Sequence, residues 1–125
     1  MLSNGISQDL VKECKQKLMI MKQDLMNRVR YSHQEFSTLE KASGDEVDQA
    51  VAQLAEDHYL IAQDRLRRQL LEIEFALSRI QNGSFGICEE TQELIEFDRL
   101  LALPFTRLSI EGAEIREAVE RKFAR

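Results

Sequence analysis

The fold depends on the stretch Ser43-Gly-Asp-Glu-Val-Asp-Gln-Ala50, which lies between two long segments with helical patterns. It holds the only glycine between Gly5 and Gly83, so we expect the chain to reverse direction here. Ser43 followed three residues later by Glu46 matches a capping box, which predicts that the second helix begins just after Ser43. The two aspartates of the stretch then stand in the first turn, where the helix dipole favours negative charge. Helix capping alone accounts for the acidic residues of this stretch, without any binding function. Acids at the end of a helical hairpin are also a candidate contact site for a partner.

Before this stretch, one amphipathic helix is predicted from about residue 8, with Ser7 as its N-cap. Its apolar stripe advances in steps of three and four residues, which is the spacing of one helix face. The stripe consists of Val11, Cys14, Leu18, Met21, Leu25, Val29, Ser32, Phe36 and Leu39. No proline interrupts it, and a helix of this length has to bury the stripe against another element.

After the stretch, a second helix of similar length is predicted to end at Asn82-Gly83, a C-cap signal. Its apolar stripe consists of Val47, Val51, Leu54, His58, Ile61, Leu66, Leu70, Ile73, Leu77 and Ile80. The step of five between Ile61 and Leu66 predicts a local phase slip, and His58 falls on the stripe as a packing residue. Two helices of matched length joined by a short turn pack antiparallel. We therefore predict a coiled-coil hairpin over residues 1–83 with its tip at 43–50.

Residues 84–125 differ in pattern and predict a small globular head that ends in a C-terminal helix. Alternation between Glu93 and Phe97 is compatible with a short β-hairpin, and one helical turn is expected before Pro104. The last helix, 111–123, is amphipathic. The apolar residues expected to pack the head are Phe85, Ile87, Leu94, Ile95, Phe97, Leu100, Leu103, Phe105, Ile110, Ile115, Val119 and Phe123. The fold class is therefore mainly α.

Composition narrows the functional classes. The chain has 125 residues and a net charge of -5, which argues against direct DNA binding, since phosphate contacts need clustered Lys and Arg. No run of eighteen apolar residues is present, so no membrane span is expected. No signal peptide is seen at the N-terminus, and the two cysteines, Cys14 and Cys88, have no partner motif. A reducing cytoplasm is the expected location.

Two motifs give the sequence a resemblance to a known family. The first runs from Ile73 through Arg79-Ile-Gln-Asn-Gly-Ser-Phe-Gly-Ile-Cys88 and is followed by Arg99-Leu-x-Ala-x-Pro104. The second is Asp45-x-x-Asp48-x-Ala50, at the expected distance before the first. Together they resemble the DnaK-suppressor (DksA/TraR) family of bacterial transcription factors. The resemblance covers about 40–120 by sequence and the first helix only by pattern.

The resemblance implies a function without catalysis. Members of this family insert the hairpin into the secondary channel of bacterial RNA polymerase, where the tip acids come near the active centre and alter open-complex stability. On this basis Asp45, Asp48 and Ala50 form the polymerase-contacting tip, and Asp48 is expected to matter most. Such a factor acts by binding polymerase states with different affinities.

The sequence departs from the family at its zinc site. The typical member has four cysteines, and the corresponding positions here are Cys88, Thr91, Ser109 and Gly112. A structural zinc site needs four nitrogen or sulfur ligands, and three of these residues supply none. We therefore expect a degenerate, zinc-independent head held by apolar packing, with no cofactor. Cys88 is expected to be a half-buried leftover thiol, with a redox-sensitive thiol as the alternative.

A second departure concerns guanosine tetraphosphate, the alarmone of the stringent response. By register with the family, Arg65 keeps one of the basic positions that help to bind it. Glu72, Leu103 and Ala113 stand where other basic residues are expected. A polyphosphate site that loses most of its cations should bind weakly at best.

Two other functional classes remain as alternatives. A helical-hairpin adaptor or chaperone-like protein would use the same scaffold on another partner, and one variant of it is a self-associating coiled coil. An enzyme is disfavoured because Asp45 and Asp48 on an exposed tip lack walls that exclude water. A hairpin that closes its own seam is expected to be a monomer.

Overall fold

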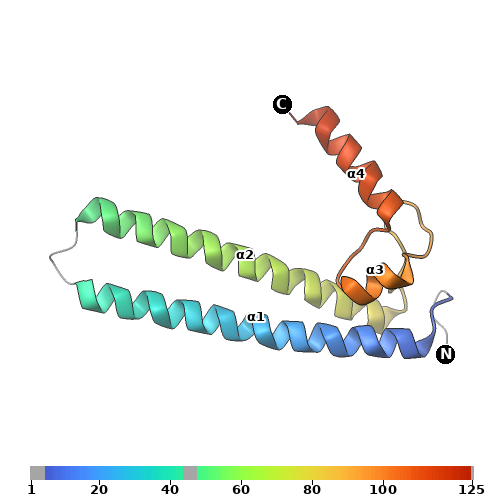
Figure 1. Ribbon diagram of the computed structural model, residues 1–125, viewed down its shortest axis with the longest axis horizontal. Coiled ribbons are helices and arrows are strands. Elements are labelled where there is room, and N and C mark those ends of the chain that lie inside the picture. Colours follow the sequence, from blue (N-terminus) through green and yellow to red (C-terminus); the bar gives the residue numbers. More distant parts are fainter. Residues whose placement is uncertain (1–4, 44–47, 125) are drawn as a thin grey trace. The chain divides into compact units, whose positions relative to one another are not determined.

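The computed structural model describes residues 5–43 and 48–124. Four α-helices lie within those ranges: α1 (Gln8–Ser43), α2 (Gln49–Asn82), α3 (Phe97–Ala102) and α4 (Ile110–Phe123). The helices α1 and α2 run antiparallel and side by side as a long hairpin (Figure 1). The prediction of a mainly helical fold built on such a hairpin is confirmed. None of the described helices is long and apolar enough to cross a membrane.

The chain divides into two compact units, and both long helices contribute to each. Met21–Leu71 forms one unit, here called the hairpin unit. Met1–Ile20 and Glu72–Arg125 form the other, here called the base unit. The base unit therefore combines the two outer ends of α1 and α2 with α3, α4 and the loops between them.

In the hairpin unit, the helices pack through polar and aromatic residues as well as aliphatic ones. The rings of Phe36 and Tyr59 stack with centroids 4.2 Å apart, and His33 Nδ1 lies 2.8 Å from the Tyr59 hydroxyl. The buried Gln63 donates from Nε2 to the carbonyl of Val29 at 3.4 Å. These contacts fix which face of α2 meets α1.

That face corrects the predicted stripe on α2. His58 is exposed and Ile61 is 60% exposed, so neither lies on the inner face. The inner face consists instead of Tyr59, Gln63, Leu66, Leu70 and Ile73, which advance in alternating steps of four and three. The predicted phase slip is therefore wrong. The predicted stripe left out Tyr59 and Gln63, although both have partners across the hairpin.

In the base unit, α1, α2 and α3 surround one apolar core. The Cys14 thiol approaches the carbonyl of Leu100 at 3.6 Å, and Lys17 Nζ donates to the carbonyl of Leu101 at 2.9 Å, so the last turn of α3 is tied to α1. The side chains buried in this core are Ile6, Cys14, Leu18, Ile73, Ala76, Phe85, Cys88, Ile95, Leu100 and Pro104. The expected role of Phe85, Ile95 and Leu100 in packing the head is confirmed.

The helix α4 does not pack as expected. Its residues Ile115, Val119 and Phe123 are 38%, 49% and 77% exposed, so they form a stripe on its surface and not part of the head core. Ser109 caps the helix by accepting a hydrogen bond from the amide of Gly112. The amphipathic pattern predicted the helix correctly, but a pattern alone does not say which apolar face finds a partner.

The loop between α2 and α3 contains one antiparallel bridge between Ile87 and Leu94 in place of the short β-hairpin considered from the sequence. The amide of Cys88 donates to the carbonyl of Glu93 at 2.8 Å, and the amide of Ile95 donates to the carbonyl of Gly86 at 2.8 Å. Gly86 has a φ of 87°, and a Cβ there would lie 1.8 Å from Ile6 Cδ1. The turn therefore needs glycine at this position for both backbone conformation and space.

Candidate partner-binding tip and degenerate zinc cluster

The hairpin tip is built differently from the sequence prediction. Ser43 is the last residue of α1, and α2 begins at Gln49, so the prediction that Ser43 caps the second helix is wrong. Asp48 takes that role, because its Oδ1 accepts a hydrogen bond from the amide of Ala50 at 3.1 Å. Asp45, the other predicted tip acid, lies outside the described residues. An aspartate can cap a helix as well as a serine, so the side chain of Asp48 suffices to begin α2 five residues later than predicted.

The capping bond uses only part of the Asp48 carboxylate. The side chain is exposed, and Oδ2 has no hydrogen-bond partner among the described residues. Ala50, the second residue of α2, is exposed beside it. Asp48 thus presents a negative charge outward from a position that its own helix fixes, where the positive end of the helix dipole stabilises it.

Removing this cap should loosen the first turn of α2. We expect Asp48→Ala to speed hydrogen exchange of the Ala50 and Ala52 amides about fivefold, which corresponds to about 1 kcal/mol for a lost N-cap. In the wild-type chain, the amide of Ala50 donates to the side chain of Asp48, and the amide of Ala52 donates to its backbone carbonyl. Asp48→Asn should leave the exchange rates nearly unchanged, because asparagine caps equally well. Equal exchange in both variants would contradict the capping role.

A groove lies beside the tip, between the last turns of α1 and the first turns of α2. Its volume is about 590 Å³, and Leu39 and Val51 on its walls are each 58% exposed. The lining residues are Phe36, Leu39, Glu40, Gln49, Val51, Ala52, Gln53, Ala55 and Glu56. Leu39 and Val51 belong to the predicted stripes, so the apolar pattern placed them inside the hairpin and gave no sign of the groove.

In the base unit, the four positions that correspond to zinc ligands lie together. The amide of Thr91 donates to Cys88 Sγ at 3.4 Å, and the amide of Gly112 donates to Ser109 Oγ at 3.0 Å. A Cβ built on Gly112 would lie 2.4 Å from Cys88 Sγ and 3.3 Å from Ser109 Oγ. Cys88 is fully buried and Ser109 is 5% exposed. We call these four residues the sulfur cluster.

Among the described residues of the base unit, three groups have shifted pKa values. Burial raises the pKa of the Cys88 thiol, but hydrogen bonds with Ser109 and Thr91 outweigh it and lower the pKa to about 6. Burial also raises the pKa of the Cys14 thiol. Burial lowers the pKa of Arg79. Hydrogen bonds to a sulfur favour its thiolate, so the sulfur cluster favours the thiolate form of Cys88.

The sulfur cluster does not fit a structural zinc ion. Tetrahedral sites take four cysteine or histidine ligands. Here one thiol is accompanied by a hydroxyl, a second hydroxyl that already caps α4, and a glycine. No group of three or more His, Cys, Asp or Glu side chains in residues 5–43 and 48–124 is arranged to hold a metal ion. The donor set therefore lacks three of the four ligands.

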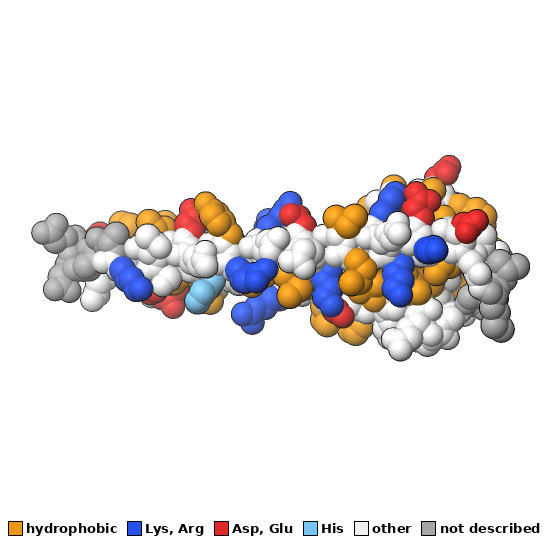
Figure 2. Space-filling view, turned by 90° about the horizontal axis from the view of Figure 1, so that it is seen from below, with side chains coloured by type: hydrophobic (Ala, Val, Ile, Leu, Met, Phe, Trp, Pro, Cys, Tyr) orange, Lys and Arg blue, Asp and Glu red, His pale blue; other side chains and the backbone are white. Residues whose placement is uncertain are grey.

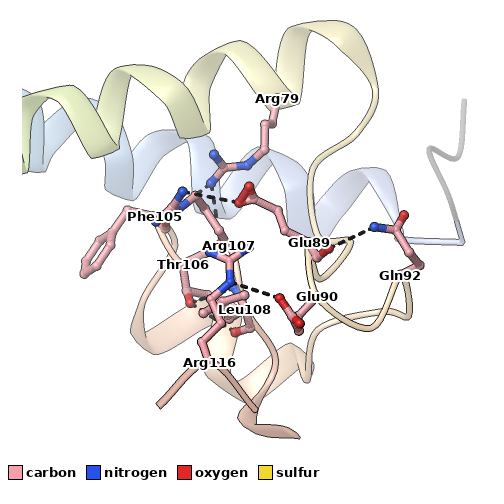
Figure 3. Close-up of polar contacts among 9 residues, drawn as sticks. All are labelled: Arg79, Glu89, Glu90, Gln92, Phe105, Thr106, Arg107, Leu108 and Arg116. Atoms are coloured by element: carbon pink, nitrogen blue, oxygen red, sulfur yellow. Dashed lines mark hydrogen bonds and ion pairs between the residues drawn. The ribbon is translucent and has the colours of Figure 1, made fainter. Parts of the chain in front are cut away.

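Figure 3 shows polar contacts between chain segments that flank the residues of the sulfur cluster. Arg79, near the end of α2, donates to the carbonyls of Phe105 and Thr106 at 3.2 and 3.5 Å. The turn after Cys88 is joined to the later segments by two ion pairs. These are Arg107–Glu89 at 3.4 Å and Arg116–Glu90 at 3.0 Å. These partially exposed pairs supplement the apolar core.

The positions compared with an alarmone site carry few cations. Arg65 is an exposed residue of the hairpin unit. In the base unit, Leu103 is 38% exposed, and Glu72 lines a hollow of about 170 Å³ together with Arg107 and residues 105, 106 and 108. Ala113 lies in the first turns of α4. A carboxylate on the wall of this hollow disfavours a polyphosphate there.

The chain is similar in sequence to a known protein family and to several known proteins. Residues 83–118 match the family described as the prokaryotic dksA/traR C4-type zinc finger. The RNA polymerase-binding transcription factor DksA of Caulobacter vibrioides is 36% identical over 110 residues, covering 86% of this chain and 75% of that protein. An uncharacterized protein of Aquifex aeolicus is 32% identical over 114 residues, covering 87% of this chain and 77% of that protein.

Solved structures agree with these relatives. The transcription factor DksA2 from Pseudomonas aeruginosa superposes with a TM-score of 0.84 at 31% identity, covering 92% of this chain and 88% of that one. The RNA polymerase binding protein and transcriptional regulator Dks from Chlamydia trachomatis shares the fold alone, with a TM-score of 0.55 at 19% identity over 91% of this chain and 94% of that one. The sequence motifs, the helical hairpin and these relatives show that the chain belongs to the DksA/TraR family.

Proposed function

We propose that this protein is a transcription regulator that binds bacterial RNA polymerase. It inserts the tip of its hairpin into the secondary channel and alters open-complex stability. The observation that carries this proposal is the exposed Asp48 carboxylate, which the capping bond to the Ala50 amide fixes at the start of α2. The name of the Caulobacter relative, an RNA polymerase-binding transcription factor, supports the same partner.

The tip suits regulation better than catalysis. Asp48 is solvent-exposed, and a catalytic carboxylate needs a site that excludes water and positions a second group. Asp48, with Asp45 and Ala50 as the other proposed contacts, instead acts by interacting differently with two polymerase states. A ligand shifts an equilibrium only through such a difference in affinity. We therefore infer a factor without enzymatic activity.

The charge distribution supports a protein partner over DNA. Lys and Arg side chains on the face in Figure 2 form small groups separated by hydrophobic and polar side chains. Together with the net charge of -5, this arrangement does not suit a phosphate backbone. The stripe Ile115, Val119 and Phe123 on α4 is an additional apolar surface for a protein partner.

The proposed function also includes the location and oligomeric state of the protein and its independence of cofactors. The protein works as a cytoplasmic monomer, its base unit needs no zinc, and guanosine tetraphosphate adds little to its effect. The last point rests on the cations that the family positions lack, since Arg65 stands without basic residues at 72, 103 and 113.

The groove beside the tip favours a second candidate function. A groove of about 590 Å³ with exposed Leu39 and Val51 among glutamates and glutamines also suits an adaptor or chaperone-like protein that holds an amphipathic segment of another partner. This function would not depend on the charge of Asp48.

A cross-linking experiment tests the proposed insertion. Gln49 is replaced by the photoreactive amino acid benzoylphenylalanine, and the full chain is irradiated with bacterial RNA polymerase core enzyme. We expect cross-links to the subunits that line the secondary channel. The matched control carries the same amino acid at Lys15, an exposed residue of α1 in the base unit, and should not label the channel interior. Polymerase that neither binds the chain nor cross-links to position 49 would favour the adaptor.

A further inference from the structure

We propose that the Cys88 sulfur holds the sulfur cluster together in the place of a metal ion, and that Gly112 makes the room for it. This proposal concerns the base unit and does not depend on polymerase binding.

The Cys88 sulfur lies against the backbone of Gly112. A Cβ at residue 112 would lie 2.4 Å from Cys88 Sγ, whereas real Cβ atoms essentially never approach another heavy atom within 3.0 Å. In a tetrahedral zinc site with Zn–S bonds of about 2.3 Å, the metal holds the ligand sulfurs about 3.8 Å apart, and each ligand needs a Cβ. The cluster has therefore closed around the sulfur, and no volume is left there for a fourth ligand's side chain.

The backbone conformation at Gly112 does not require a glycine. Gly112 lies in the first turn of α4 with a helical backbone, so no positive φ requires glycine there. Alanine is the stronger helix former, because glycine loses more backbone entropy on folding. A glycine that the backbone does not need is explained by the sulfur beside it.

The polar groups of the sulfur cluster all have hydrogen-bond partners within the protein. The amide of Thr91 donates to Cys88 Sγ, and the amide of Gly112 donates to Ser109 Oγ. No buried side-chain nitrogen or oxygen in the described part of the chain lacks a hydrogen-bond partner. Both halves of the cluster are therefore satisfied by protein atoms, and the cluster needs no cation to compensate a set of thiolates.

A double-mutant cycle tests the pairing of Cys88 with Gly112. In the wild-type chain, we expect Gly112→Ala to lower Tm on the order of 10 °C, because the new methyl group meets a buried sulfur. In a Cys88→Ala background the sulfur is gone, and the same Gly112→Ala change should leave Tm within about 2 °C, or raise it through helix propensity. If Gly112→Ala prevents folding alone, the double variant should restore it. An equal loss in both backgrounds would overturn the proposal.

Metal analysis of the unmodified chain tests whether the Cys88 sulfur takes the place of a metal ion. The protein is purified from cells grown with added zinc, and its metal content and its Tm with and without a chelator are measured. We expect far less than one zinc per chain and the same Tm in both conditions, because the cluster is complete without metal. One zinc per chain, or a Tm that falls with the chelator, would contradict the account.

Discussion

Phe85→Ala should lower the free energy of unfolding by about 3–5 kcal/mol, the usual range for a buried phenylalanine. Phe85 is 1% exposed and is the largest of the fully buried side chains described. Phe85 sits in the turn after α2, and its own backbone amide donates to the carbonyl of Arg79. Because this bond holds the turn in place, a cavity there cannot easily close by a backbone shift. The measurement is urea unfolding followed by circular dichroism, with the slope checked for two-state behaviour.

Phe97→Ala is the matched control for this prediction. Phe97 lies in the same unit, at the start of α3, but half of its side chain is exposed. Truncating it should cost about 1 kcal/mol, since less apolar surface leaves the core. Equal losses for the two variants would show that the base unit is not organised around Phe85.

Asp48→Asn should abolish most of the effect on open-complex lifetime while leaving the hairpin folded. The change keeps the shape of the side chain and its ability to cap α2, and it removes only the negative charge. Hydrogen bonds to charged groups contribute about 1.5–3 kcal/mol, so losing one from a single polymerase state shifts the balance between states by about tenfold or more.

Two comparisons separate charge from structure in that result. Asp57→Asn makes the same chemical change at another exposed position of α2, where the carboxylate accepts from Gln53 at 3.0 Å, and should behave like wild type. Asp48→Ala should lose the effect and also loosen the first turn of α2. Wild-type activity in Asp48→Asn would show that the tip works without its charge.

Local patterns predicted the helices and their outer ends. The Ser7 cap is confirmed by a hydrogen bond from the Leu10 amide to its hydroxyl at 3.2 Å. Asn82-Gly83 ends α2, and Gly83 has the positive φ that this signal implies. Spacing of three and four residues sufficed for such features, because they depend on neighbours along the chain.

Features that depend on partners across space were harder to predict. The inner positions of Tyr59 and Gln63 rest on Phe36, His33 and Val29, which lie on the other helix. The spacing of the predicted stripe instead placed His58 on the inner face, although it is exposed. Polar residues that are satisfied inside a seam look like surface residues in any pattern based on apolar spacing.

The candidate site was predicted unevenly for the same reason. The resemblance identified Cys88, Thr91, Ser109 and Gly112 as equivalent positions, and the structure brings them together. The closure of Gly112 onto the sulfur depends on how α4 meets the turn, and sequence spacing carries no information on that distance. Cys88 is fully buried and not half-buried as expected, because this closure covers it.

The measurement that tests the central claim most directly is the lifetime of open complexes at a ribosomal RNA promoter. The polymerase is saturated with wild-type protein, Asp48→Asn or Asp57→Asn, and decay is followed after a competitor is added. The account predicts that wild type and Asp57→Asn shorten the lifetime, while Asp48→Asn binds polymerase and leaves it unchanged. A lifetime that wild type at saturation does not alter would contradict the proposed regulation through the hairpin tip.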